Sequence, residues 1–123
     1  MRTLSAVLLL ALVTACHRAV EVTGLYVNRG DSTRAAIGGH FFPCDDPGTL
    51  WLIQDSALAT QYQRIASRPG QLLVARLVGV GTDSGSIYYG RHYFEVRRIL
   101  DLRIRAPGEC PGVADTVPPA LRG

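Results

Sequence analysis

The chain has 123 residues, of which 47% are hydrophobic, and a formal net charge of +3. This length and apolar content suit one compact domain with its own core. The charge balance is too mild to indicate nucleic-acid binding, so we expect no nucleic-acid partner.

Residues 1–15 have the pattern of a secretory signal peptide. Arg2 supplies an early positive charge, and residues 4–13 form an apolar run of roughly ten residues. A spanning helix needs about 20 apolar residues. The run therefore predicts export rather than a transmembrane helix.

The apolar run ends in Val13, Thr14, Ala15 and Cys16. This order of an aliphatic residue, a small residue, Ala and Cys resembles the lipobox of bacterial lipoproteins. The resemblance implies that the Cys16 sulfur receives a diacylglyceryl group and that a peptidase cuts before Cys16. An ordinary signal peptide with a chance cysteine is the alternative. Because His17 rather than Asp follows, resemblance to enterobacterial sorting implies the periplasmic face of the outer membrane.

Lipidation of Cys16 leaves Cys44 and Cys110 as an even pair in an exported chain. Such a pair predicts one disulfide. The alternative is a pair of thiols that binds a metal, with His40 as the nearest histidine in sequence. The two cysteines lack a CxxC arrangement, and the Asp-Asp pair after Cys44 is typical of a turn. We therefore expect no metal site.

The first part of the mature chain has the pattern of three short strands. Residues 20–28 are rich in Val and Thr, which favours a strand. We expect further strands at residues 35–42 and 49–53. The segments 28–34 and 43–48 contain Gly, Pro, Asp and Ser, which are typical of turns.

A helix is predicted after the third strand. Asp55 or Ser56 can cap it by accepting from backbone N–H groups of the first turn. Leu58, Tyr62 and Ile65 then fall on one helical face. A Ser-Arg-Pro-Gly stretch ends the helix, because proline disfavours helical geometry in the residue before it.

Two longer strands are predicted to follow. Residues 71–80 are apolar on both faces, and residues 81–86 form a turn. The last strand alternates strictly, with one apolar face. That face comprises Phe94, Val96, Leu100, Leu102 and Ile104. Arg98 and Ile99 break the alternation, which predicts a bulge near residues 97–99.

The order of three strands, one helix and two strands is that of the OB-fold. We therefore predict a mainly β protein, a small OB-like five-stranded barrel with one helix between strands three and four. An open antiparallel sheet with a packed helix is the alternative. We assign residues 16–19 to a lipidated tether, 20–110 to the barrel and 111–123 to a Pro-rich disordered tail.

Several motifs resemble, in their order, the OB-type C-terminal domain of NlpE-like envelope lipoproteins. They are Gly24-Leu25-Tyr26, Phe41-Phe42-Pro43-Cys44, Trp51, ALATQY (57–62), LLVARLVG (72–79) and YFEVRRIL (93–100). The resemblance covers residues 24–110. It implies the barrel fold and a disulfide between Cys44 and Cys110.

The resemblance also implies a role in the envelope. NlpE-like proteins are implicated in copper homeostasis, surface sensing and envelope stress signalling, but their CxxC-bearing N-terminal domain has no counterpart in this sequence. We expect a lipid-anchored, non-enzymatic module that docks an envelope protein or senses stress or surfaces. A copper-homeostasis accessory is an alternative. No motif such as GxSxG indicates an enzyme, and we expect no cofactor.

A second alternative is a barrel that binds an anionic ligand, such as a lipid head group, lipopolysaccharide or a glycan. Basic and aromatic residues gather in the last two strands, and OB barrels bind ligands on such faces. The candidate face comprises Arg76, Arg91, Tyr93, Arg97, Arg103 and Arg105. A solvated strand face is the competing interpretation.

Overall fold

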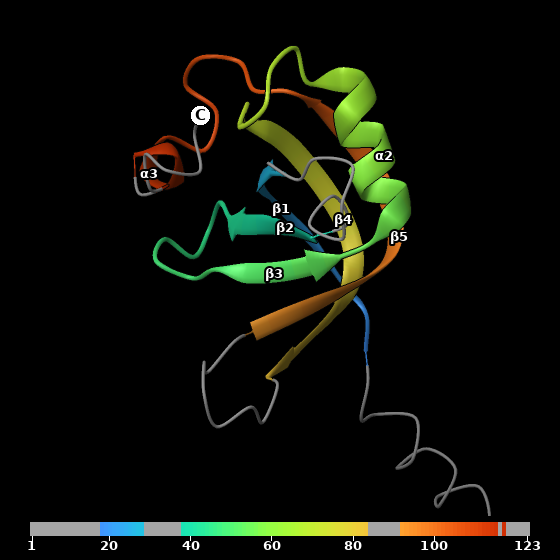
Figure 1. The fold of residues 1–123 in the computed structure, drawn as a ribbon. Coiled ribbons are helices and arrows are strands. Elements are labelled where there is room, and N and C mark those ends of the chain that lie inside the picture. Colours follow the sequence, from blue (N-terminus) through green and yellow to red (C-terminus); the bar gives the residue numbers. More distant parts are fainter. Residues whose placement is uncertain (1–17, 29–37, 84–91, 116, 118–123) are drawn as a thin grey trace, which may run out of the picture.

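The computed structural model describes residues 18–28, 38–83, 92–115 and 117. Cys16, Arg91 and most of the residues beyond Ala114 therefore lie outside the described residues. Its elements, shown in Figure 1, are β1 Val20–Val27, β2 Gly38–Pro43, β3 Trp51–Gln54, α2 Ser56–Ile65, β4 Leu73–Asp83, β5 His92–Ile104 and α3 Pro111–Ala114.

The strands close into a barrel in the order β1-β2-β3-β5-β4, with β4 pairing back to β1. Neighbouring strands are antiparallel except for β3 and β5, which run parallel and pair Trp51 with His92. With α2 between β3 and β4, this confirms the predicted OB-like fold. The alternative of an open sheet is wrong.

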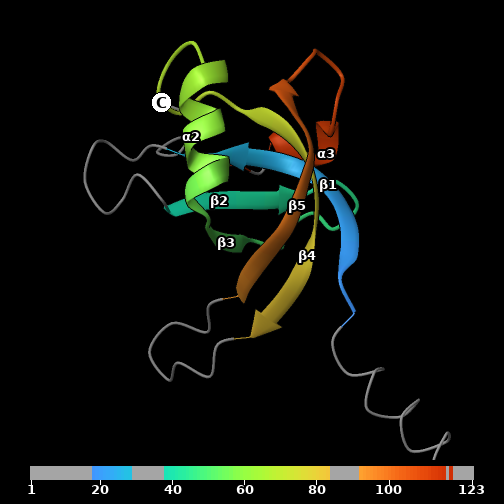
Figure 2. The same ribbon diagram turned by 90° about the vertical axis from the view of Figure 1, so that its right-hand side faces the viewer.

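β1 bends along its length, and its strand partners change along it as well. It pairs with β4 from Val20 to Tyr26, but its pairing with β2 begins only at Gly24. A Cβ at Gly24 would lie 2.6 Å from the Phe41 ring. The absence of a side chain at Gly24 therefore lets the Phe41 ring pack directly against the β1 backbone. Figure 2 shows the first half of β1 extending past β2.

The barrel interior is filled by large side chains from the strands and from α2. Leu58 and Tyr62 of α2 are buried with Tyr26 and Phe41, which confirms the predicted apolar face of the helix. The rings of Tyr26 and Tyr62 meet edge to face at 5.6 Å. The Asp55 side chain caps α2 by accepting from the Leu58 N–H at 2.8 Å.

β5 contains the predicted irregularity. The register with β4 shifts twice, so that Arg97 and Leu100 have no Cα partner in β4. Ile99 consequently packs against the interior core, whereas Leu100 does not belong to that core. The expectation that Leu100 shares the apolar face was wrong, because each extra residue reverses the direction of the side chains that follow.

The segment after Cys110 packs on the outside of the barrel. Residues 111–115 and 117 form a strap, which contains α3 and whose Val113, Ala114 and Val117 are buried. They cover a second apolar cluster made by strand residues that point outward. Those strand residues are Leu25, Val27, Phe42 and Val74. This corrects the predicted disorder of the tail 111–123 for residues 111–115 and 117, because Val113, Ala114 and Val117 find a complementary strand face. Residues 116 and 118–123 of that tail lie outside the described residues.

Candidate functional site

The structure joins Cys44, just after β2, to Cys110, just before α3, with their Cα atoms 5.1 Å apart. This distance lies in the usual range for disulfides. The bond spans 66 residues of sequence and attaches the strap to the loop between β2 and β3. Cys110 has a left-handed backbone with φ 47°, which turns the chain into α3.

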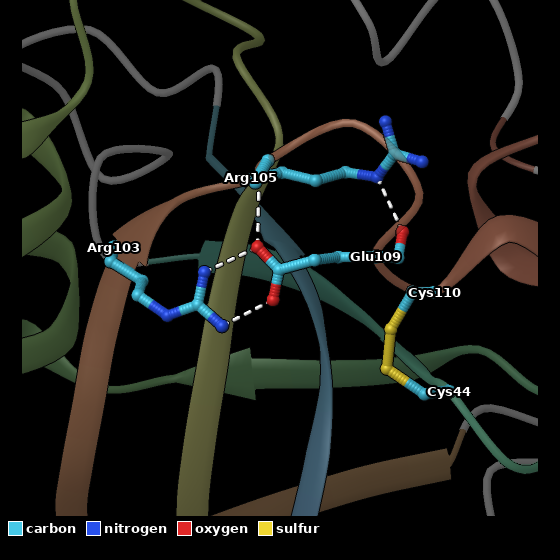
Figure 3. Close-up of a disulfide and its surroundings, with 6 residues drawn as sticks. Cys44, Arg103, Arg105, Glu109 and Cys110 are labelled. Carbon is cyan, nitrogen blue, oxygen red and sulfur yellow. Dashed lines mark hydrogen bonds and ion pairs between the residues drawn. A yellow bond between two sulfur atoms is a disulfide. The ribbon is translucent and has the colours of Figure 1, made fainter.

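Glu109 connects the same region to β5. Both of its carboxylate oxygens accept hydrogen bonds from the guanidinium of Arg103, and Oε1 also accepts from the Ala106 N–H at 2.8 Å. Arg105 Nε donates to the Glu109 carbonyl at 2.7 Å. Figure 3 shows both arginines turned toward the turn that carries Cys110.

This pairing changes the acidity of Glu109. The hydrogen bonds from Arg103 and then from the Ala106 N–H lower the pKa of Glu109 to about 2, because they stabilise the ionised carboxylate. The same hydrogen bond raises the pKa of the Arg103 guanidinium. Arg103 and Arg105 are therefore engaged within the protein itself.

The remaining residues of the candidate anion face do not gather with them. A guanidinium nitrogen of Arg97 lies 3.6 Å from a carboxylate oxygen of Glu95. Arg76 is exposed on β4 opposite Asp101 of β5. Tyr93 borders a separate hollow of about 250 Å³. The rest of that hollow is lined by Gly38, Gly39, His40, Leu52, Ile53 and Gln54. The described members thus occupy different parts of the surface, and Arg91 lies outside the described residues.

The potential metal ligands near Cys44 are also separated. His40 borders the hollow beside Tyr93, whereas Asp45 and Asp46 border a different cleft. Cys44 is bonded to Cys110. Within the described segments, no group of three or more His, Cys, Asp or Glu side chains could hold a metal ion.

A wider cleft of about 640 Å³, here called the β1 cleft, opens beside the first half of β1. It is lined by Glu21, Val22, Thr23, Pro43, Cys44, Asp45, Asp46 and Trp51. Carboxylates of Glu21, Asp45 and Asp46 are exposed around it, and the Trp51 side chain is partly exposed. The cleft thus combines negative charge with an aromatic surface.

Sequence analysis did not identify the β1 cleft or Glu109. Glu21 and Asp45 are far apart in the chain, and only the pairing of β1 with β2 brings their segments together. Glu109 had a usable signal, because Arg103 and Arg105 share one parity in the sequence and Glu109 is the nearest acid that follows them. The spacing of the arginines groups them as one surface and does not show which acid folds back onto them.

Among the described segments, no helix combines the length and apolar character needed to cross a bilayer. Comparisons with protein-family models, with curated proteins and with solved structures find no match to this chain.

Proposed function

We propose that this protein is a lipid-anchored, non-enzymatic module of the bacterial envelope that docks a protein partner in stress or surface sensing. The observation that carries the proposal is the lipobox-like order from Val13 to Cys16, placed four residues before β1 begins at Val20. The resemblance to the C-terminal domain of NlpE-like lipoproteins supports the docking role.

A lipid on Cys16 would hold the barrel close to the bilayer. Three residues separate Cys16 from Val20, and the four residue-to-residue steps between them cover at most about 14 Å in an extended chain. Several acyl chains anchor a protein stably, whereas one chain does so only marginally. With His17 after Cys16, we place the protein on the periplasmic face of the outer membrane.

The anchoring is tested by replacing Cys16 with Ser. We expect the wild-type protein to fractionate with membranes and to carry acyl chains in its intact mass, and the Cys16→Ser protein to carry none. Ser5→Ala, in the apolar run, is the control and should behave like the wild type. Acyl chains on Cys16→Ser, or a wild-type protein without them, would refute the assignment.

Docking is tested by affinity capture with the full-length protein from detergent-solubilised membranes, alongside lipid and glycan arrays. We expect one envelope protein to be enriched reproducibly and no array component to bind tightly. Tight binding of a single anionic lipid or glycan without protein enrichment would refute the docking function and favour the ligand-binding alternative.

One observation favours the anionic-ligand alternative. The double bulge of β5 leaves Arg97 and Arg98 both exposed, and they border a hollow of about 320 Å³ beside Asp55 and Gln61. Two neighbouring guanidinium groups suit a phosphate or carboxylate. If this hollow binds lipopolysaccharide or anionic vesicles, Arg97→Gln with Arg98→Gln should abolish the binding, whereas Arg64→Gln on α2 should not.

A further inference from the structure

The β1 cleft lies along a stretch of β1 that has only one strand neighbour. Residues 20–22 pair with β4, and within the described segments no strand pairs with them on the opposite edge, where the contact with the β2 side ends at Thr23. That edge opens into the cleft, because Glu21, Val22 and Thr23 line it. An open strand edge is a template for another extended chain.

We propose that the β1 cleft binds an extended, arginine- or lysine-containing segment of a partner protein, which adds as a strand to the open edge of β1. The inference rests on the proposed docking function and names the surface and the chemistry of the bound segment. Strand addition supplies main-chain hydrogen bonds, and side-chain contacts at alternate positions supply specificity.

The backbone of β1 presents hydrogen-bonding groups to the cleft. The Thr23 carbonyl accepts from the Cys44 N–H at 3.0 Å, so the polar backbone groups of Thr23 point toward the β2 side. Successive residues of a strand direct these groups to opposite edges. Glu21, two residues earlier, therefore directs its N–H and C=O to the same edge, beyond the end of β2 at Pro43.

The charge around the cleft selects a basic segment. Glu21, Asp45 and Asp46 place three exposed carboxylates on its rim, in a chain whose net charge is +3. Basic side chains would meet complementary charge here, whereas acidic ones would be repelled. A peptide bound along β1 would bring its alternate side chains past Glu21 and the loop after β2.

Trp51 provides an apolar contact at the other side of the cleft. Its ring meets those of Phe94 and His92 edge to face, at centroid distances of 6.1 and 5.5 Å. A Cβ at Gly81 would lie 2.5 Å from the Trp51 ring, so the ring is also packed against this glycine. A guanidinium or ammonium group can lie over such an aromatic face.

The loop that carries Asp45 and Asp46 is held in place before any partner arrives. The disulfide fixes its start at Cys44, and Thr49 Oγ1 donates to Asp46 Oδ2 at 2.7 Å. A preorganised wall reduces the ordering cost of binding.

The chain contains a single tryptophan, so its fluorescence reports directly on the β1 cleft. The full-length protein in detergent is titrated with an eight-residue peptide of alternating threonine and arginine. A matched peptide has glutamate in place of arginine. We expect a saturable change in fluorescence with the basic peptide and at least about tenfold weaker binding of the acidic one.

N-methylated peptides test strand addition. Methyl groups on every second backbone nitrogen block one edge of the peptide and leave its charge unchanged. We expect methylation of one edge to abolish binding and methylation of the other edge to have little effect, because only one edge can pair with β1. Equal tolerance of methylation at both edges would overturn the proposal.

Variants test the rim. Glu21→Gln combined with Asp45→Asn should weaken binding of the basic peptide at least about fivefold. Glu95→Gln with Asp115→Asn removes the same charge outside the cleft and is the matched control. The proposal would be overturned if the two pairs of substitutions weakened peptide binding equally, or if the acidic peptide bound as tightly as the basic one. It would also be overturned if spermidine bound as tightly as the basic peptide.

These outcomes can be separated from the proposed function. If the basic peptide does not bind but affinity capture enriches an envelope protein, docking stands and uses another surface. If the peptide binds but Cys16→Ser remains acylated, the proposal that the β1 cleft binds a basic segment is retained and the assignment of Cys16 as the lipid anchor is wrong.

Discussion

Glu109 holds the turn after β5 against the strand itself. The Arg103 guanidinium donates to both carboxylate oxygens, and the side chain of Glu109 remains 27% exposed. A bidentate pair of this kind restricts orientation more than a single contact does. Because Cys110 is the next residue, the pair orients the backbone that enters the disulfide.

The pKa of Glu109 predicts a pH dependence. With a folded pKa of about 2 against an ordinary value of 4.5, the carboxylate stabilises the fold above about pH 5, and this contribution disappears as the pH falls toward 2. Glu109→Gln should therefore lower the melting temperature at neutral pH, with a difference from wild type that vanishes near pH 2. Thermal melts across this range measure it.

Glu95→Gln is the control for this experiment, since Glu95 and Arg97 are both more than half exposed and 3.6 Å apart. Its effect should be small, as for most surface pairs. A Glu109→Gln protein that is destabilised equally at pH 2 and pH 7 would contradict the role assigned to the pair.

At the scale of elements, the stability of α2 depends on Asp55, the N-cap residue that precedes the helix. The Asp55 carboxylate accepts the Leu58 N–H, and Leu58 is fully buried in the interior core. Asp55→Ala should lower the free energy of unfolding by about 1 kcal/mol, measured by urea denaturation. Asp55→Asn retains a capping oxygen and should cost much less. Equal losses in the two variants would refute the capping role.

The elements were largely predictable because their signals are local. Val- and Thr-rich or apolar runs between turn residues predicted the first four strands, and alternation predicted the last. Asp55 with the spacing of Leu58 and Tyr62 predicted α2. The position of the β5 bulges was not predictable in detail, since it depends on the register with β4. Ile99 therefore enters the interior, although its sequence parity places it outside.

The surfaces were less predictable than the elements. Arg103 and Arg97 belong to one strand with the same parity, yet they pair with different carboxylates, Glu109 and Glu95. Sequence shows which residues share a strand face, but it does not show which loops fold back over that face. The β1 cleft depends likewise on a contact between distant segments.

For the whole molecule, the barrel has apolar clusters on both sides of its wall. Tyr26 and Phe41 fill the interior, while Leu25 and Phe42, their neighbours in sequence, point outward and are covered by the strap. A strand with apolar residues on both faces requires cover on both. The disulfide secures the outer cover, whose described part contains one four-residue helix.

Removal of the disulfide should destabilise the whole domain. Cys44→Ser with Cys110→Ser should lower the free energy of unfolding by about 2–4 kcal/mol, because closing a 66-residue separation restricts the unfolded chain. Chemical denaturation measures the change. Cys16→Ser keeps the disulfide and should leave stability unchanged. An unaltered unfolding midpoint in the double variant would contradict a stabilising role.

The position of the strap in the chain determines the time at which the outer face becomes protected. During synthesis the segments that form β1 to β5 emerge before residue 110, so the barrel can close while Leu25, Val27, Phe42 and Val74 are still uncovered. Exposed apolar strand surface promotes aggregation in folding intermediates. The yield of this protein in the cell should therefore depend on how quickly its last segment docks, in addition to how stable the finished fold is.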